Sequence, residues 1–63
     1  MTILESKYYP GRQFIIALGQ STEDKPITDL KTDSIYIEWD TGKTYVFDED
    51  SSEWNLWGGG SNG

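Results

Sequence analysis

The stretch that decides the fold reads Ser34-Ile-Tyr-Ile-Glu-Trp-Asp-Thr-Gly-Lys-Thr-Tyr-Val-Phe-Asp-Glu-Asp-Ser-Ser-Glu-Trp-Asn-Leu-Trp57. Short runs rich in isoleucine, tyrosine, valine, phenylalanine and tryptophan are interrupted by Asp40-Thr41-Gly42 and by the acidic segment 48–52. Aromatic and β-branched residues favour strands, whereas Gly, Asp and Ser between such runs favour turns. The stretch therefore predicts a three-stranded antiparallel meander.

The length of the first turn decides which side chains share a face of this meander. Side chains alternate along a strand, so Ile35, Ile37 and Trp39 are expected on one face of their strand. Tyr45 and Phe47 share a face of the next strand for the same reason. A three-residue turn brings the two sets to the same face, whereas a two- or four-residue turn sends them to opposite faces. The three-residue turn needs a positive φ at its third position, which glycine adopts without a Cβ clash, so we predict Asp40-Thr41-Gly42 as the structural turn.

The second turn is expected to span residues 49–52. That length pairs Phe47 with Trp54 and Tyr45 with Leu56, so one face of the sheet gathers most of the apolar side chains. The opposite face is then partly exposed to solvent, as is usual for an antiparallel meander. Tyr36 and Trp57 are expected to be exposed on it.

The remainder of the chain adds one strand and several connecting segments. Residues 12–18 are apolar and β-branched between two glycines, which predicts a buried fourth strand, and residues 20–32 form a polar loop with Ile27 and Leu30 against the core. No window longer than about ten residues shows the 3.6-residue period of a helix. The predicted fold class is all-β: a small antiparallel meander of three to four strands (12–57), an extended N-terminal docking arm (1–11) and a flexible Gly-rich C-terminal tail (58–63).

Composition limits both stability and function. The 63 residues are 35% hydrophobic, without cysteine or histidine, so neither disulfides nor histidine zinc ligands support the fold. The net charge of -6 excludes nucleic-acid binding through a basic footprint, and no apolar run is long enough to span a membrane. A chain of this length buries only roughly 60% of its unfolded surface, so we expect it to be ordered within a homo-oligomer or a larger assembly.

Catalytic and metal motifs are poorly supported. Asp40-Thr41-Gly42 matches the tripeptide of aspartic proteases, but the chain is too short for the paired lobes of such an enzyme, and a turn explains the tripeptide fully. The acidic segment 48–53 has Glu53 and Gly59 where a calcium-binding EF-hand loop needs glycine and glutamate. The absence of histidine and cysteine leaves no ordinary nucleophile and base pair. We therefore expect no enzymatic activity, cofactor or metal.

The segment 34–57 resembles the small structural proteins encoded among the head and tail genes of tailed bacteriophages. Those proteins often have a strand ending in an acidic residue and Asp-Thr-Gly-Lys, then an alternating Tyr and Phe strand, an acidic turn and a Trp-bearing strand. The matching residues here are Glu38, Asp40, Thr41, Gly42, Lys43, Tyr45, Phe47, Asp48 and Trp54. The resemblance implies a non-enzymatic virion accessory protein that decorates the capsid or belongs to a head fibre or tail. Its partners would be a larger virion structural protein and copies of itself.

Exposed aromatic residues and the arm are the predicted interface. The candidate interface residues are Tyr8, Tyr9, Arg12, Tyr36 and Trp57. An alternative function is a carbohydrate- or host-surface-binding module that stacks sugar rings on Tyr36 and Trp57, because aromatic rings on small sheets also serve that purpose.

Overall fold

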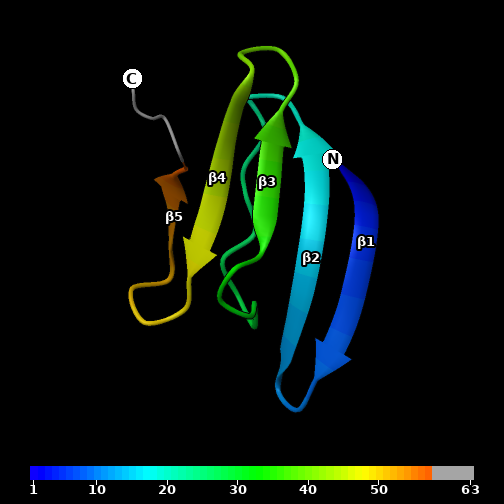
Figure 1. The fold of residues 1–63 in the computed structure, drawn as a ribbon, viewed down its shortest axis with the longest axis vertical. Coiled ribbons are helices and arrows are strands. Elements are labelled where there is room, and N and C mark those ends of the chain that lie inside the picture. Colours follow the sequence, from blue (N-terminus) through cyan, green and yellow to red (C-terminus); the bar gives the residue numbers. More distant parts are fainter. Residues whose placement is uncertain (58–63) are drawn as a thin grey trace.

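Five strands lie side by side in sequence order in the computed structural model, which describes residues 1–57 (Figure 1). They are β1 (Thr2–Tyr9), β2 (Arg12–Gly19), β3 (Ile35–Glu38), β4 (Lys43–Asp48) and β5 (Glu53–Leu56). No helix occurs within residues 1–57, so the all-β prediction is confirmed. The predicted tail, 58–63, lies outside the described residues.

The N-terminal residues belong to the sheet. Residues expected to form an extended arm instead make β1, which pairs antiparallel with β2 along its whole length. Tyr9 pairs with Arg12 around the two-residue turn Pro10-Gly11, where Gly11 has φ of 75°. Proline followed by a glycine with positive φ is the pattern of a tight reversal, so the turn signal in the sequence joins two strands rather than an arm and a domain.

The connection between β2 and β3 is a crossover, because these two strands are parallel. This corrects the expectation of a purely antiparallel meander. Residues 20–34 pass over one face of the sheet, behind β3 in Figure 1. The Gln13 N–H donates to the Asp29 carbonyl at 2.8 Å, and the Lys31 N–H donates to the Gln13 carbonyl at 2.9 Å. These bonds place Leu30 in the core as predicted, whereas Ile27 is 55% exposed and the prediction for it was wrong.

The turn between β3 and β4 is one residue longer than predicted. Glu38 pairs with Lys43, so the turn spans residues 39–42 and Tyr36 lies opposite Tyr45. The predicted pairing of Ile37 with Tyr45 was therefore wrong. Gly42 does have the expected positive φ, 79°, and its N–H donates to the Glu38 carbonyl at 2.8 Å. The predicted pairs in the next hairpin, Phe47 with Trp54 and Tyr45 with Leu56, are confirmed.

The core lies between the sheet and the crossover, on what we call the inner face. Its buried apolar residues are Ile15, Ala17, Leu30, Tyr36 and Phe47. Trp54 packs edge-on against Phe47 at 5.1 Å and against Tyr36 at 6.0 Å between ring centroids. Its indole N–H donates to the Pro26 carbonyl at 2.8 Å, which ties the crossover to β5. This aromatic cluster thus joins β3, β4 and β5 to the segment that covers them.

The opposite face of the sheet, which we call the outer face, is also apolar. Side chains alternate along each strand, and the observed pairing aligns this alternation between neighbouring strands. Apolar side chains of β2, β3 and β4, and of the residue just after β5, therefore share this face. The outer-face apolar residues are Phe14, Ile16, Leu18, Ile35, Ile37, Val46 and Trp57. None of them is fully buried, and the crossover lies on the other side of the sheet (Figure 1). The molecule therefore has one covered and one uncovered apolar face.

Candidate functional site

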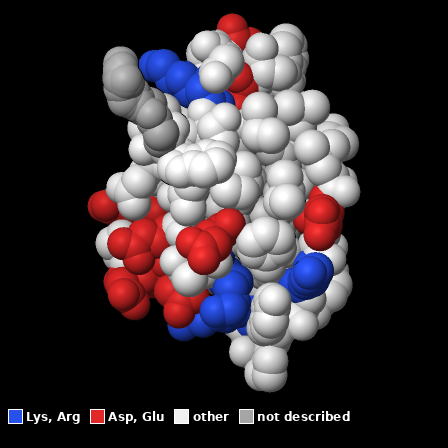
Figure 2. Space-filling view, in the orientation of Figure 1, with Lys and Arg blue, Asp and Glu red and all other residues white. Residues whose placement is uncertain are grey.

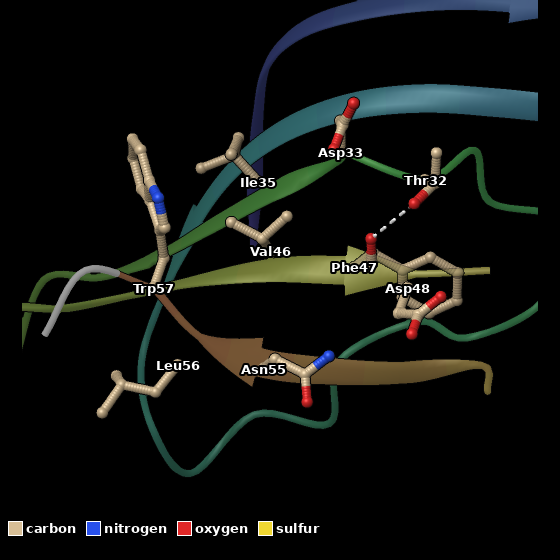
Figure 3. Close-up of a pocket in the computed structure, with 9 residues that line it drawn as sticks. All are labelled: Thr32, Asp33, Ile35, Val46, Phe47, Asp48, Asn55, Leu56 and Trp57. Atoms are coloured by element: carbon tan, nitrogen blue, oxygen red, sulfur yellow. Dashed lines mark hydrogen bonds between the residues drawn. The ribbon is translucent and has the colours of Figure 1, made fainter. Parts of the chain in front are cut away.

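An open groove of about 500 Å³ lies on the outer face, over β3, β4 and β5. Figure 3 shows the side chains of Ile35, Val46 and Trp57 projecting to the same side of the sheet. The groove is lined by Thr32, Asp33, Ile35, Val46, Phe47, Asp48, Asn55, Leu56 and Trp57. Its floor is apolar except for the Asn55 amide, and the Thr32, Asp33 and Asp48 side chains lie at one end (Figure 3), an arrangement suited to holding an apolar side chain of another molecule.

Strand pairing fixes the positions of these side chains. Ile35 lies opposite Val46, and Val46 lies opposite Asn55, so the three form one row across the groove. Trp57 continues the ladder beyond β5, because its N–H donates to the Thr44 carbonyl at 2.8 Å. The tryptophan side chain is 61% exposed at one end of the groove. The groove is therefore formed largely by β3, β4 and β5, with Thr32 and Asp33 contributed by the end of the crossover.

The other end of the groove is acidic. Asp33 lies two residues before Ile35, and its N–H donates to the Phe47 carbonyl at 3.1 Å. Asp48 lies opposite Glu53, so these three carboxylates form a row near the turn between β4 and β5. Figure 2, in the orientation of Figure 1, shows red atoms gathered at this lower left corner, with blue Lys and Arg atoms directly beside them. We call Asp33, Asp48 and Glu53 the acidic rim.

The chemistry available in the groove is set by its lining residues. Within residues 1–57 no group of His, Cys, Asp and Glu side chains could hold a metal ion. The same residues include no helix that could cross a membrane. The groove has an aromatic ring, an aliphatic floor, an amide, carboxylates and the Thr32 hydroxyl, which donates to the Phe47 carbonyl at 3.2 Å.

A buried ion pair on the inner face holds the crossover in place. Glu38 is almost fully buried, and one of its carboxylate oxygens lies 2.7 Å from the Lys25 ammonium. The same ammonium lies over the rings of Tyr36 and Tyr45, at 4.8 and 4.6 Å from their centroids. Hydrogen bonds from Lys25 and from the Thr41 hydroxyl lower the pKa of Glu38, against the opposing effect of burial. The carboxylate is therefore kept charged and paired rather than neutral.

The turn predicted as structural also connects to the crossover. Both the N–H and the hydroxyl of Ser21 donate to the Asp40 carboxylate, at 3.0 and 2.7 Å. The hydroxyl bond is the main reason that the pKa of Asp40 is lowered. Thr41 donates to Glu38 at 2.7 Å, so Asp40 and Thr41 each tie the turn to a different neighbour. The bonds made by these residues are structural.

The predicted interface residues do not come together at one place. Tyr8 is 80% exposed and Tyr9 is also exposed, both at the hairpin end of β1, whereas Trp57 lies over β4 and β5. Arg12 is engaged within the chain, since its guanidinium lies 3.7 Å from Glu49 and donates to the Leu30 carbonyl at 3.5 Å. Tyr36 is fully buried, and burial raises its pKa, so the expectation of an exposed Tyr36 was wrong.

Sequence reasoning missed the floor of the groove. Ile35 and Val46 were assigned to opposite faces, although the structure pairs them directly. The available signal was the second apolar set in each strand: Phe14, Ile16 and Leu18 alternate with the buried residues of β2 as regularly as Ile35 and Ile37 do in β3. A sheet with two apolar faces satisfies that pattern.

Comparisons of the chain with protein-family models, with curated proteins and with solved structures find no match.

Proposed function

We propose that the chain is a non-enzymatic accessory protein of a tailed-bacteriophage virion that attaches to a larger capsid or tail protein through its outer face and also self-associates. The uncovered outer face carries the proposal. An apolar sheet face exposed to water is unfavourable, and contiguous patches of this kind mark interaction surfaces. The viral part of the proposal is supported by the resemblance of the Asp40-Thr41-Gly42 hairpin to those of phage structural proteins.

The charges around the outer face indicate the chemistry of the partner. The acidic rim lies at one end of the groove, and Lys7 lies across the sheet on β1, opposite Phe14. The matching surface of the partner has an apolar centre and lysine or arginine side chains facing the acidic rim. Complementary charge of this kind sets orientation and accelerates association, and salt weakens it.

A second copy of the chain is a poor occupant for the outer face. Asp33, Asp48, Glu53 and Glu5 outnumber Lys7 and Arg12 on this side of the sheet, and Arg12 is already paired with Glu49 within the chain. Two outer faces packed together would bring an excess of like charge into contact, which suppresses association. This face is therefore assigned to a different protein, and self-association to another part of the molecule.

Virus particles provide the test. A host that carries the gene is induced to release particles, which are purified by density-gradient centrifugation and analysed by quantitative mass spectrometry. The wild-type chain is expected at a fixed ratio to the major structural proteins. Ile35→Glu, on the groove floor, is expected to abolish incorporation, because it places a charge in the apolar contact. Ile27→Glu is the matched control, since Ile27 is exposed on the crossover, and it is expected to be incorporated normally.

Two results would contradict the proposal separately. Particles that lack the wild-type chain would contradict the viral part. Normal incorporation of folded Ile35→Glu would contradict the docking surface.

Carbohydrate binding is the alternative proposal and has weaker support, because the burial of Tyr36 leaves Trp57 without its expected partner ring. Loss of glycan-array binding in Trp57→Ala with normal particle incorporation would favour that alternative.

A further inference from the structure

β1 is an open sheet edge of unusual length for so small a protein. It has eight residues, all exposed, and it contacts only β2 among the strands. The opposite edge strand, β5, has four residues. An edge strand leaves one row of backbone N–H and C=O groups free to pair with another strand, and short edges are one way in which proteins limit such pairing. β1, with eight residues, is not shortened in this way.

The hairpin turn determines which backbone groups of β1 face outward. A two-residue turn is closed by a pair that exchanges both hydrogen bonds, here Tyr9 and Arg12. The backbone N–H and C=O groups of successive residues point to alternate sides of the strand. Those of Lys7 therefore point toward β2, while those of Tyr8 and Ser6 point away from the sheet. The bulge between Ile3 and Glu5 interrupts the regular pattern near the start of the strand. Ser6 is therefore the first residue after the bulge whose backbone groups face outward in the regular pattern.

The side chains around Ser6 are complementary to their own copy. Glu5 and Lys7 lie on the same side of β1, since they pair with Ile16 and Phe14 of the outer face. Within residues 1–57 neither has an ion-pair partner. In an antiparallel pair of β1 strands centred on Ser6, Glu5 of each copy lies directly opposite Lys7 of the other. Opposite charges in directly opposed positions stabilise a strand pair.

Other registers lack this complementarity. An in-register parallel pair sets Glu5 beside Glu5 and Lys7 beside Lys7, which is unfavourable. An antiparallel pair centred on Tyr8 brings Ser6 opposite Pro10, which has no N–H to donate. In the register centred on Ser6, Tyr8 of each copy lies opposite the bulge at Leu4, so the regular pairs are Ser6 with Ser6 and Glu5 with Lys7.

We propose that two copies of the chain pair through β1, antiparallel and centred on Ser6, to form one continuous sheet. The two-fold axis is perpendicular to the sheet at Ser6, which makes the interface isologous. The outer faces of the two copies then lie on the same side of the joined sheet. The pairing uses the edge alone, so it does not depend on the docking function proposed for the outer face.

Charge reversal tests the register. Sedimentation equilibrium of the full chain at low salt, up to about 1 mM, measures the dimer Kd. Lys7→Glu and Glu5→Lys each convert both cross-strand pairs to like charges, and each is expected to weaken the dimer about tenfold or more. The double variant Glu5→Lys/Lys7→Glu is expected to restore it. An equimolar mixture of the two single variants is expected to form a heterodimer, because every opposed pair is again of opposite sign.

A backbone substitution tests the edge itself. Ser6→Pro removes an outward-facing N–H that β2 does not use, so the monomer tolerates it and the dimer does not. Ser6→Ala is the matched control, because it keeps the N–H, and it is expected to dimerise as the wild type does. Ile35→Glu, on the outer face, is also expected to leave the dimer unchanged. A wild-type chain that stays monomeric throughout the concentration range would overturn the proposal, as would a mixture of the reversed variants without heterodimer.

Discussion

Gly19 occupies a position in β2 where no larger residue fits, and this gives a quantitative test of the inner face. A Cβ added to Gly19 would lie 2.1 Å from the Tyr36 hydroxyl oxygen and 2.9 Å from Cζ of the same ring. Tyr36 is fully buried, and its ring is held against Trp54 and beneath the Lys25 ammonium. The ring therefore has little room to move aside when Gly19→Ala is introduced.

The expected cost follows from opposing effects. Overpacking of a buried site costs about 1–3 kcal/mol, and displacement of Tyr36 also loses its hydrogen bond to the Gln20 carbonyl, which contributes about 1 kcal/mol. Replacement of glycine by alanine within a strand also stabilises the fold by about 0.5–1 kcal/mol, because it reduces the conformational entropy of the unfolded chain. Gly19→Ala should therefore destabilise the fold by about 2 kcal/mol, or about 8–16 °C in Tm.

A double-mutant cycle with Tyr36→Phe identifies the cause. Tyr36→Phe alone should cost about 1 kcal/mol for the lost hydrogen bond, but in the presence of Gly19→Ala it removes the closest clash. The double variant should therefore be at least about 1 kcal/mol more stable than the sum of the single effects predicts. Urea unfolding followed by tryptophan fluorescence measures all four proteins. Gly11→Ala with Tyr36→Phe is the control cycle, since nothing lies within 4 Å of a Cβ at Gly11, and it should be additive. Additive costs for the Gly19 cycle would refute the reasoning.

Truncation should lower the free energy of unfolding more on the inner face than on the outer face. In urea unfolding, Phe47→Ala should lower it by about 3–5 kcal/mol and the neighbouring Val46→Ala by less than about 1 kcal/mol. Equal losses would contradict the assignment of these residues to different faces. Gly42→Val should lower stability by about 1–3 kcal/mol through strain at φ of 79°, and an unchanged thermal melt would contradict this turn geometry. Because the pKa of Glu38 is lowered from its ordinary value of 4.5, the stability it contributes is present above that pH and is lost as the pH falls through the folded-state pKa. Urea midpoints from neutral pH to pH 3 or so should therefore fall less steeply for Glu38→Gln than for wild type, and identical slopes would contradict the role of the Lys25 pair.

The sequence predicted local structure well where one residue settles the question. Gly42 marks the first turn and has the expected positive φ, and the acidic turn before Trp54 has the predicted length. The strand at residues 12–18 was recognised because glycines bound an apolar run. In each of these cases the deciding physics lies within a few residues of chain.

The register of β3 against β4 could not be settled in that way. Gly42 is compatible with both a three- and a four-residue turn, so the choice depended on assuming a single apolar face. The four-residue turn buries Glu38, which a local reading of the sequence disfavours. What makes this burial acceptable is Lys25, which reaches Glu38 from the crossover at 2.7 Å. The contact of Lys25 with Glu38, between separate segments of the chain, is thus compatible with a register that a local reading disfavours, and a one-residue change of register moves every side chain of the strand to the other face.

The role of the N-terminal residues was missed for a related reason. Residues 1–9 lack a clean alternation because the bulge at Leu4 shifts the pattern by one residue, and the strand is exposed throughout. A strand that buries little of its own surface has a weak sequence signature, although the pairing of Tyr9 with Arg12 makes it part of the sheet.

Footprinting with a photoactivated carbene reagent, on the free chain and on purified particles, tests whether the outer face is the docking surface. Trp57 on the outer face and Ile27 on the crossover are 61% and 55% exposed, so both should be labelled in the free chain. On the particle, the account predicts that Trp57 and its groove neighbours Ile35 and Val46 become protected while Ile27 stays labelled. Protection of Ile27 with continued labelling of Trp57 would show that the protein binds by its other side and would contradict the account.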